Sequence, residues 1–177
     1  MLNSLFRNFS PRLIFGLMFL FCLGSVSYAF YAQIYQGAEP CPLCIAQRII
    51  YGIVGILSFI ALINNCQGFG SKFYALLLLA SSGFGIKTAY HHVWLQSLPP
   101  EQWPASCGMP LEVLYHKIPL TGFIHTILSG TAECAMVNWK IFGFSGPLLS
   151  LIGFIILAMA SLYVLIYRQT KRYDYSL

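Results

Sequence analysis

The stretch LIFGLMFLFCLGSVSYAFYAQIY, residues 13–35, decides the fold class, because it carries no charged side chain over 23 positions. A helix that crosses a bilayer needs about 20 consecutive, mostly apolar residues. Three further stretches meet this need: residues 45–63, which contain Arg48, residues 73–94, which contain Lys87, and residues 147–167. The sequence therefore predicts an all-α membrane protein, a bundle of four transmembrane helices.

The composition argues against a water-soluble globular protein. Hydrophobic residues make up 58% of the 177 residues and charged residues 8%, whereas a soluble domain is about 25% charged. The net charge is +5, but the one dense basic cluster is RQTKR at residues 168–172, so nucleic-acid binding is not indicated. The length predicts a single integral membrane domain over residues 1–177, with the lipid bilayer as its surroundings.

The distribution of basic residues predicts the orientation. Four spans put both termini on one side of the membrane, and six of the ten lysines and arginines fall on that side. Because basic residues concentrate in cytoplasmic segments, both termini are expected in the cytoplasm. The alternative is that residues 13–35 are a signal peptide, with SVSYA offering small residues for cleavage. It is disfavoured because this apolar stretch is much longer than the usual run of about 7–15 residues.

Two loops then face outward, a short one before residue 45 and a long one over residues 95–146. The long loop is rich in Pro, Gly and Trp, and its apolar segment LEVLYHKIPLTGFIHTIL is compatible with a short helix in the membrane interface. Four of the six cysteines fall in the outward part, enough for two pairs in an oxidising compartment. They are Cys41, Cys44, Cys107 and Cys134. The other two, Cys22 and Cys66, are expected to be small, reduced filler residues.

The segment CPLCIAQR, residues 41–48, places thiol chemistry at the start of the second span. With Cys41 as N-cap and Pro42 as the first helical residue, Cys44 falls at the third position, where unpaired backbone N–H groups stabilise a thiolate. The thiolate is the reactive form, so this arrangement predicts a redox pair. Arg48 lies one turn deeper on the same face. A charge at that depth is usually functional, and it is expected to stabilise the Cys44 thiolate or an anion on a ligand.

Other interpretations of these residues stay open. A zinc site needs further ligands at matching spacing, which the remaining cysteines and histidines do not offer along the sequence. A purely structural disulfide between the two cysteines is one alternative to a redox site. Arg48 could likewise only extend to the lipid head groups. His91 and His92 end the third span at about the depth of the CPLC helix start, where either can hydrogen-bond a ligand or face water.

Three motifs, together with the four spans, carry a resemblance to a known family that covers nearly the whole chain. They are CPLCIAQR at the start of the second span, a cysteine in the Pro-rich LPPEQWPASCGMP of the second outer loop, and GTAECAMVNW before the fourth span. With four spans, this pattern resembles the DsbB family, the quinone-coupled thiol oxidases of bacterial inner membranes.

The resemblance implies a path for electrons. A reduced periplasmic DsbA-like protein of thioredoxin fold attacks a Cys107–Cys134 disulfide, with Cys107 forming the mixed disulfide. Electrons pass from Cys134 to Cys41, and Cys44 hands them to ubiquinone or menaquinone from the membrane pool.

The resemblance also implies that Arg48 and His92 lie beside the quinone. Three rival interpretations exist. The first is a vitamin K epoxide reductase, whose active C-x-x-C belongs near the last helices rather than the second. The second is a non-enzymatic membrane subunit with disulfide-stapled loops, and the third is a metal-binding membrane protein.

Overall fold

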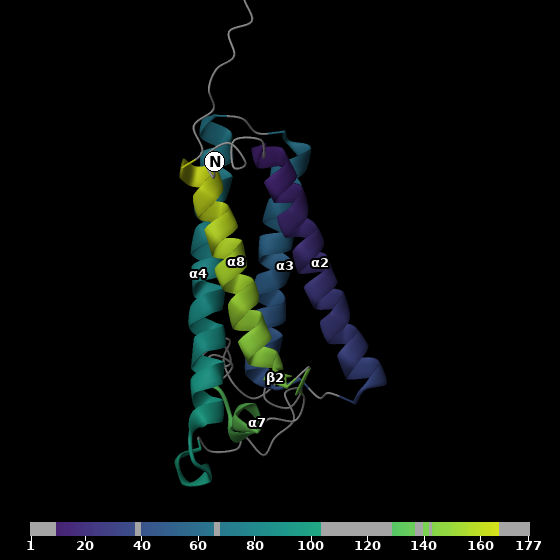
Figure 1. Cartoon of the computed structure of the whole chain (residues 1–177), viewed down its shortest axis with the longest axis vertical. Coiled ribbons are helices and arrows are strands. Elements are labelled where there is room, and N and C mark those ends of the chain that lie inside the picture. Colours follow the sequence, from purple (N-terminus) through teal and green to yellow (C-terminus); the bar gives the residue numbers. More distant parts are fainter. Residues whose placement is uncertain are drawn as a thin grey trace, which may run out of the picture.

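The computed structural model describes residues 10–37, 40–65, 68–103, 129–136, 140–141 and 143–166. Its four long helices form an up-and-down bundle (Figure 1). They are α2 (Pro11–Tyr35), α3 (Pro42–Ile63), α4 (Phe69–Ser97) and α8 (Gly146–Ile166). Each is long and apolar enough to cross a membrane. The predicted class, an all-α bundle of four transmembrane helices, is confirmed.

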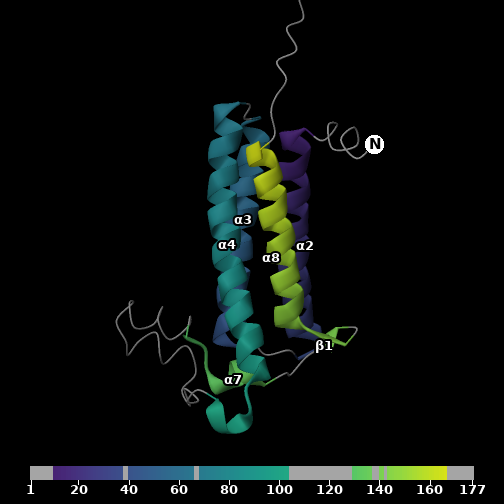
Figure 2. The same cartoon turned by 60° about the vertical axis from the view of Figure 1, so that its left-hand side comes forward.

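Smaller elements gather at one end of the bundle, where α2 and α4 end and α3 and α8 begin (Figures 1 and 2). They are the 3-10 helix η2 (Pro100–Gln102), the short helix α7 (Ala132–Ala135), and the strands β1 (Lys140–Ile141) and β2 (Phe144–Ser145), which pair antiparallel. Cys107 and the expected interfacial helix lie outside the described residues, as does Cys66, so those expectations stay predictions.

The helices begin a few residues before the predicted spans, because the capping residues are not part of the apolar runs. At the start of α2 the Ser10 hydroxyl accepts a hydrogen bond of 3.4 Å from the Leu13 N–H, and Pro11 follows at the first position. Helix α3 begins at Pro42 with Cys41 as its N-cap, as the sequence predicted. Gly68 opens α4 with a φ of +62°, a conformation that favours glycine.

The core consists of one apolar stripe from each long helix. Its largest fully buried members include Phe15 of α2, Val54 of α3, Leu78 of α4 and Phe154 of α8. The opposite faces expose large apolar side chains along the whole bundle, a pattern that suits contact with lipid and not with water. They include Leu20, Leu23, Ile53, Ile56, Leu76, Ile156 and Met159. Cys22 is buried against Gly55, which agrees with its expected role as a filler.

The helices do not pack equally around the bundle. Helix α8 packs along α4, and α2 along α3, while α2 and α8 meet at few points. The α4–α8 contact is close because the Phe154 ring lies against Gly85, where an added Cβ would come within 2.5 Å of the ring. Small residues allow such close approach between membrane helices. The bundle is therefore tight between α4 and α8 and more open between α2 and α8.

Replacing Gly85 tests this packing. We expect Gly85→Ala to lower stability by about 1–3 kcal/mol, because the new methyl group overlaps a buried ring that has little room to move. The measurement is the thermal unfolding temperature in detergent. Gly83→Ala on the same helix is the matched control, because nothing lies within 4 Å of a Cβ at that position. Equal unfolding temperatures for both variants would contradict the close α4–α8 contact.

Candidate active site

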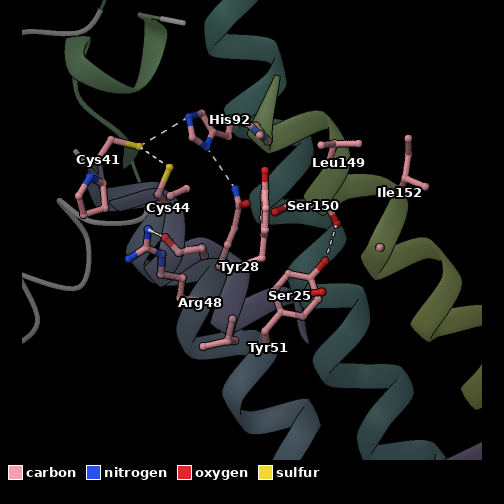
Figure 3. A pocket seen from close by; sticks show the side chains of 18 of the residues that line it. Ser25, Tyr28, Cys41, Cys44, Arg48, Tyr51, His92, Leu149, Ser150 and Ile152 are labelled. Carbon is pink, nitrogen blue, oxygen red and sulfur yellow. Dashed lines mark hydrogen bonds between the residues drawn. The ribbon is translucent and has the colours of Figure 1, made fainter. Parts of the chain in front are cut away.

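The site begins with two sulfur atoms at the start of α3. Because Cys41 is the N-cap and Cys44 the third helical residue, their side chains point to the same side, and their sulfur atoms lie 3.1 Å apart (Figure 3). Cys41 is buried and Cys44 half-buried. Proline at the first helical position fixes the start of the helix between them. The local sequence alone therefore sets up the close pair of thiols.

A third sulfur comes from α7, about ninety residues later in the chain. Helix α7 contacts both α3 and α4. It can approach closely because Gly130, with a φ of +78°, lies where a Cβ would come within 2.6 Å of Leu95 and 2.9 Å of Leu43. This places Cys134, which is fully buried, in a small apolar cluster with Cys41 and the two leucines. The structure thus joins the second loop to the C-x-x-C helix.

Cys41 and Cys134 both lie outside the transmembrane helices, and the contact between their sulfur atoms shifts their pKa values in opposite directions. A hydrogen bond from Cys41 lowers the pKa of Cys134 to about 6, with further help from backbone hydrogen bonds at Thr131 and Leu43, against the opposing effect of burial. The same contact to Cys134, another to Cys44, and burial raise the pKa of Cys41. The contact therefore favours the thiol form of Cys41 and the thiolate form of Cys134.

His92 connects these segments from α4. Its Nε2 atom lies 3.1 Å from the carbonyl oxygen of Cys134 and 3.6 Å from the Cys41 sulfur (Figure 3). Its Nδ1 atom lies 3.2 Å from the side-chain nitrogen of Gln47 on α3. A carbonyl can only accept, so Nε2 carries the proton and Nδ1 accepts from Gln47. The side chains of His92 and Gln47 are both buried, and this hydrogen bond gives a partner to Nδ1 of His92 and to the amide nitrogen of Gln47.

Arg48 is held by the last turns of α2. One guanidinium nitrogen donates to the side-chain oxygen of Gln33, and another donates to the carbonyl of Ala29 at 3.1 Å. The guanidinium also lies over the Phe30 ring, 5.3 Å from its centre. Both acceptors are oxygen atoms, and hydrogen bonds from a charged donor such as guanidinium are stronger than those between neutral groups. The arginine therefore has a fixed position one turn below Cys44.

A cavity of about 440 Å³ connects the sulfur pair with Arg48. Its walls come mainly from α2, α3 and α8, with smaller parts from α4 and α7, and they are mostly apolar. Cys41, Cys44, Arg48 and His92 are among the lining residues (Figure 3). Tyr51 closes part of the wall by donating a 3.2 Å hydrogen bond to the carbonyl of Ser150. The lining also includes Phe21, Ile152 and Ile156, which are exposed on the lipid-facing surface. The cavity therefore reaches that surface between α2 and α8.

The structure brings together most of the residues that the sequence singled out. Cys41, Cys44, Cys134 and His92 gather at one end of the bundle, and Arg48 lies just below them. Cys107 lies outside the described residues. His91 points elsewhere, with its Nε2 atom 3.0 Å from the carbonyl of Ser129.

Sequence reasoning missed three polar partners: Gln33, Gln47 and Tyr51. The first two are uncharged polar residues inside apolar helices, which was the available signal. This signal does not identify the residue that each glutamine contacts.

The sequence of the chain also matches known proteins. The family profile described as "DsbB: Disulfide bond formation protein DsbB" matches residues 11–164. Relatives named "Disulfide bond formation protein B" occur in several bacteria. That of Marinobacter nauticus is 39% identical over 163 residues, 92% of this chain and 96% of the relative. That of Xylella fastidiosa is 39% identical over 164 residues, covering 92% and 93%.

A third relative of the same name, from Acinetobacter baumannii, is 39% identical over 157 residues, which cover 88% of this chain and 91% of the relative. The matched residues of the profile include α2, α3, α4 and α7, and α8 except for its last two residues. The chain belongs to the DsbB family, the membrane oxidoreductases of disulfide bond formation.

Proposed function

We propose that this protein oxidises a periplasmic DsbA-like protein of thioredoxin fold and delivers the electrons to a membrane quinone, either ubiquinone or menaquinone. One observation carries the proposal: the sulfur atoms of Cys41 and Cys44 line an apolar cavity that reaches the lipid-facing surface. A thiol pair in that place connects a water-soluble reductant with an acceptor dissolved in the bilayer. Family membership supports disulfide formation as the outcome.

The thiol half of the reaction needs four exchanges. The partner's thiolate attacks Cys107 of a Cys107–Cys134 disulfide, and Cys134 leaves as a thiolate. The Cys134 sulfur then attacks Cys41 of a Cys41–Cys44 disulfide, releasing the Cys44 thiolate. The partner's second thiolate breaks its mixed disulfide with Cys107, and the partner leaves oxidised. The freed Cys107 thiolate attacks Cys134, which restores the Cys107–Cys134 disulfide and leaves Cys41 and Cys44 as a dithiol. Each exchange breaks one S–S bond and forms one, so electrons only change place among the sulfurs. The second exchange is supported by the close approach of the Cys41 and Cys134 sulfur atoms, which lie within 4.8 Å.

The cavity fits a quinone head group by size and chemistry. Binding pockets for small molecules measure about 300–1,000 Å³ and combine apolar walls with a few polar groups, as this cavity does. Oxidation of the Cys41–Cys44 dithiol to a disulfide releases two electrons and two protons, which a quinone bound in the cavity would accept. We assign Arg48 and His92, which both line the cavity, to its oxygen atoms. For His92 this requires Nε2–H to turn from the Cys134 carbonyl to the ligand. DsbA is a strong oxidant at about −120 mV, so its reoxidation requires a still stronger acceptor.

The same proposal includes the orientation and the extent of the working unit. We place the protein in a bacterial inner membrane, with both termini cytoplasmic, the thiol cluster periplasmic, and residues 1–177 acting as one domain. The fold supports this orientation, since α2 begins and α8 ends at one end of the bundle while Cys41 and α7 lie at the other (Figure 1). By sequence position, six of the ten lysines and arginines lie before or at the start of α2, at the start of α4 or after α8, which is the distribution expected for cytoplasmic segments.

The first test removes the thiol that faces the cavity. Cys44→Ser is expected to abolish quinone-dependent oxidation of a reduced thioredoxin-fold partner, because the Cys41–Cys44 disulfide can no longer form. The measurement is turnover of purified protein with added quinone. Cys22→Ala is the matched control, since Cys22 is a buried cysteine away from the cavity. It should retain turnover. Full turnover by Cys44→Ser would refute the proposed relay.

The second test concerns the fixed cation. Arg48→Ala is expected to raise the KM for quinone roughly tenfold or more, since a hydrogen bond from a charged donor contributes about 1.5–3 kcal/mol. The disulfides should still form on chemical oxidation. Gln33→Leu should shift the KM in the same direction by less, because Gln33 only positions the guanidinium. Lys87→Ala, which removes a cation from a span without lining the cavity, is the control. An unchanged KM for quinone in Arg48→Ala would mean that Arg48 does not bind the quinone and only extends to the lipid head groups.

A further inference from the structure

Three good ligands for soft metal ions converge from three separate elements. The Cys41 sulfur belongs to the N-cap of α3, a ring nitrogen of His92 to α4, and the Cys134 sulfur to α7. These atoms lie within 4.8 Å of one another, and all three side chains are buried. This convergence is invisible in the sequence, where the residues lie at irregular spacing.

The distances suit a tetrahedral ion. Zinc binds sulfur at about 2.3 Å and histidine nitrogen at about 2.0–2.1 Å, which puts neighbouring ligand atoms roughly 3.5–3.8 Å apart. The His92 Nε2 atom lies 3.6 Å from the Cys41 sulfur, inside that range. Cys44 supplies a further donor nearby, since its sulfur lies 3.1 Å from that of Cys41. Small movements would therefore complete a site of thiolates and imidazole.

The surroundings of His92 suit metal binding as well. To bind a metal through Nε2, the ring must carry its proton on Nδ1, which then needs an acceptor. The Gln47 side chain lies 3.2 Å from Nδ1, and a half-turn of its amide group presents the oxygen in place of the nitrogen. Ligating histidines in metalloproteins usually donate their other N–H in this way. One buried glutamine can therefore serve both states of the histidine.

The charges near the cluster oppose each other. The guanidinium of Arg48 disfavours a cation, but it hydrogen-bonds to Gln33 and Ala29 on the side of α2. Glu133, next to Cys134, lines the cavity together with Cys41 and Cys44, so a carboxylate stands beside the route to the sulfurs. In the metal-bound state, the negative charges of two thiolates and this carboxylate exceed the positive charge of Arg48.

We propose that the fully reduced protein binds one thiophilic divalent cation of the zinc class through Cys41, His92 and Cys134, and that the bound ion blocks disulfide formation. Binding replaces thiol protons with metal–sulfur bonds, releases those protons, and transfers no electron. Sulfur lone pairs held by the metal cannot attack a disulfide or lose electrons to an acceptor. Once Cys41 and Cys44 are joined in a disulfide, Cys41 is no longer a thiolate ligand. The site itself rests on geometry, and its inhibitory effect rests on the proposed function.

The binding test uses Co²⁺ as a visible probe and Zn²⁺ as competitor. Full-length protein in detergent, reduced without oxygen, should bind one Co²⁺ per chain, with thiolate-to-metal absorption bands that Zn²⁺ displaces. The oxidised protein should show none of these bands. Absence of the bands in reduced protein, or one tightly held ion in oxidised protein, would overturn the site.

Variants identify the ligands. His92→Ala should weaken Co²⁺ binding at least tenfold, while His91→Ala, which changes the adjacent histidine outside the cluster, should leave it unchanged. Gln47→Glu should tighten binding, because a carboxylate is a stronger acceptor for Nδ1–H. This gain cannot arise from a failure to fold. Equal affinities in all three variants would exclude His92 as a ligand.

A turnover assay separates this inference from the proposed function. In the presence of Zn²⁺, quinone-dependent oxidation of the partner should stop, and it should recover when a chelator is added. Turnover that ignores Zn²⁺ would overturn the inhibitory effect and leave the proposed function intact. A protein that binds Co²⁺ but shows no turnover even with chelator would overturn the proposed function and leave the metal site intact.

Discussion

The hydrogen bonds of His92 are the interaction on which the rest of the site depends. Through Nδ1 the ring contacts Gln47 of α3, and through Nε2 it contacts the Cys134 backbone beside the Cys41 sulfur. One side chain of α4 therefore fixes the distance between the C-x-x-C helix and the second loop. In an apolar bundle, buried polar groups must find their partners within the protein. That requirement makes the contact specific, since each of these groups would be costly to leave alone.

The bundle provides the frame for this contact by packing unevenly. Gly85 lets α8 settle against α4, whereas α2 leans on α3 and meets α8 at few points. The space left between α2 and α8 becomes the cavity, and the sulfur pair lines it where α3 begins. The site thus results from one close helix contact and one loose one, with Arg48 bound to the helix on the loose side.

The fold was predictable from the sequence, because long apolar runs leave few alternatives in a membrane. The N-cap position of Cys41 was predictable as well, since proline marks the start of a helix. The partners of Arg48 and His92 were not. Which side chain a buried glutamine meets depends on how each helix is rotated about its axis, and helices with apolar residues on all sides give no such signal. The approach of Cys134 depends on Gly130, whose role appears only when α7 is placed against Leu43 and Leu95.

The attachment of Arg48 to α2 links the position of its positive charge to the helix that borders the cavity. Gln33 and Ala29, which hold the guanidinium, belong to the same helix whose residues border the lipid-facing side of the cavity. The position of the guanidinium therefore depends on the position of α2 as well as on that of α3, which carries the arginine. A substitution that shifts α2 would change both the width of this side of the cavity and the place of its positive charge.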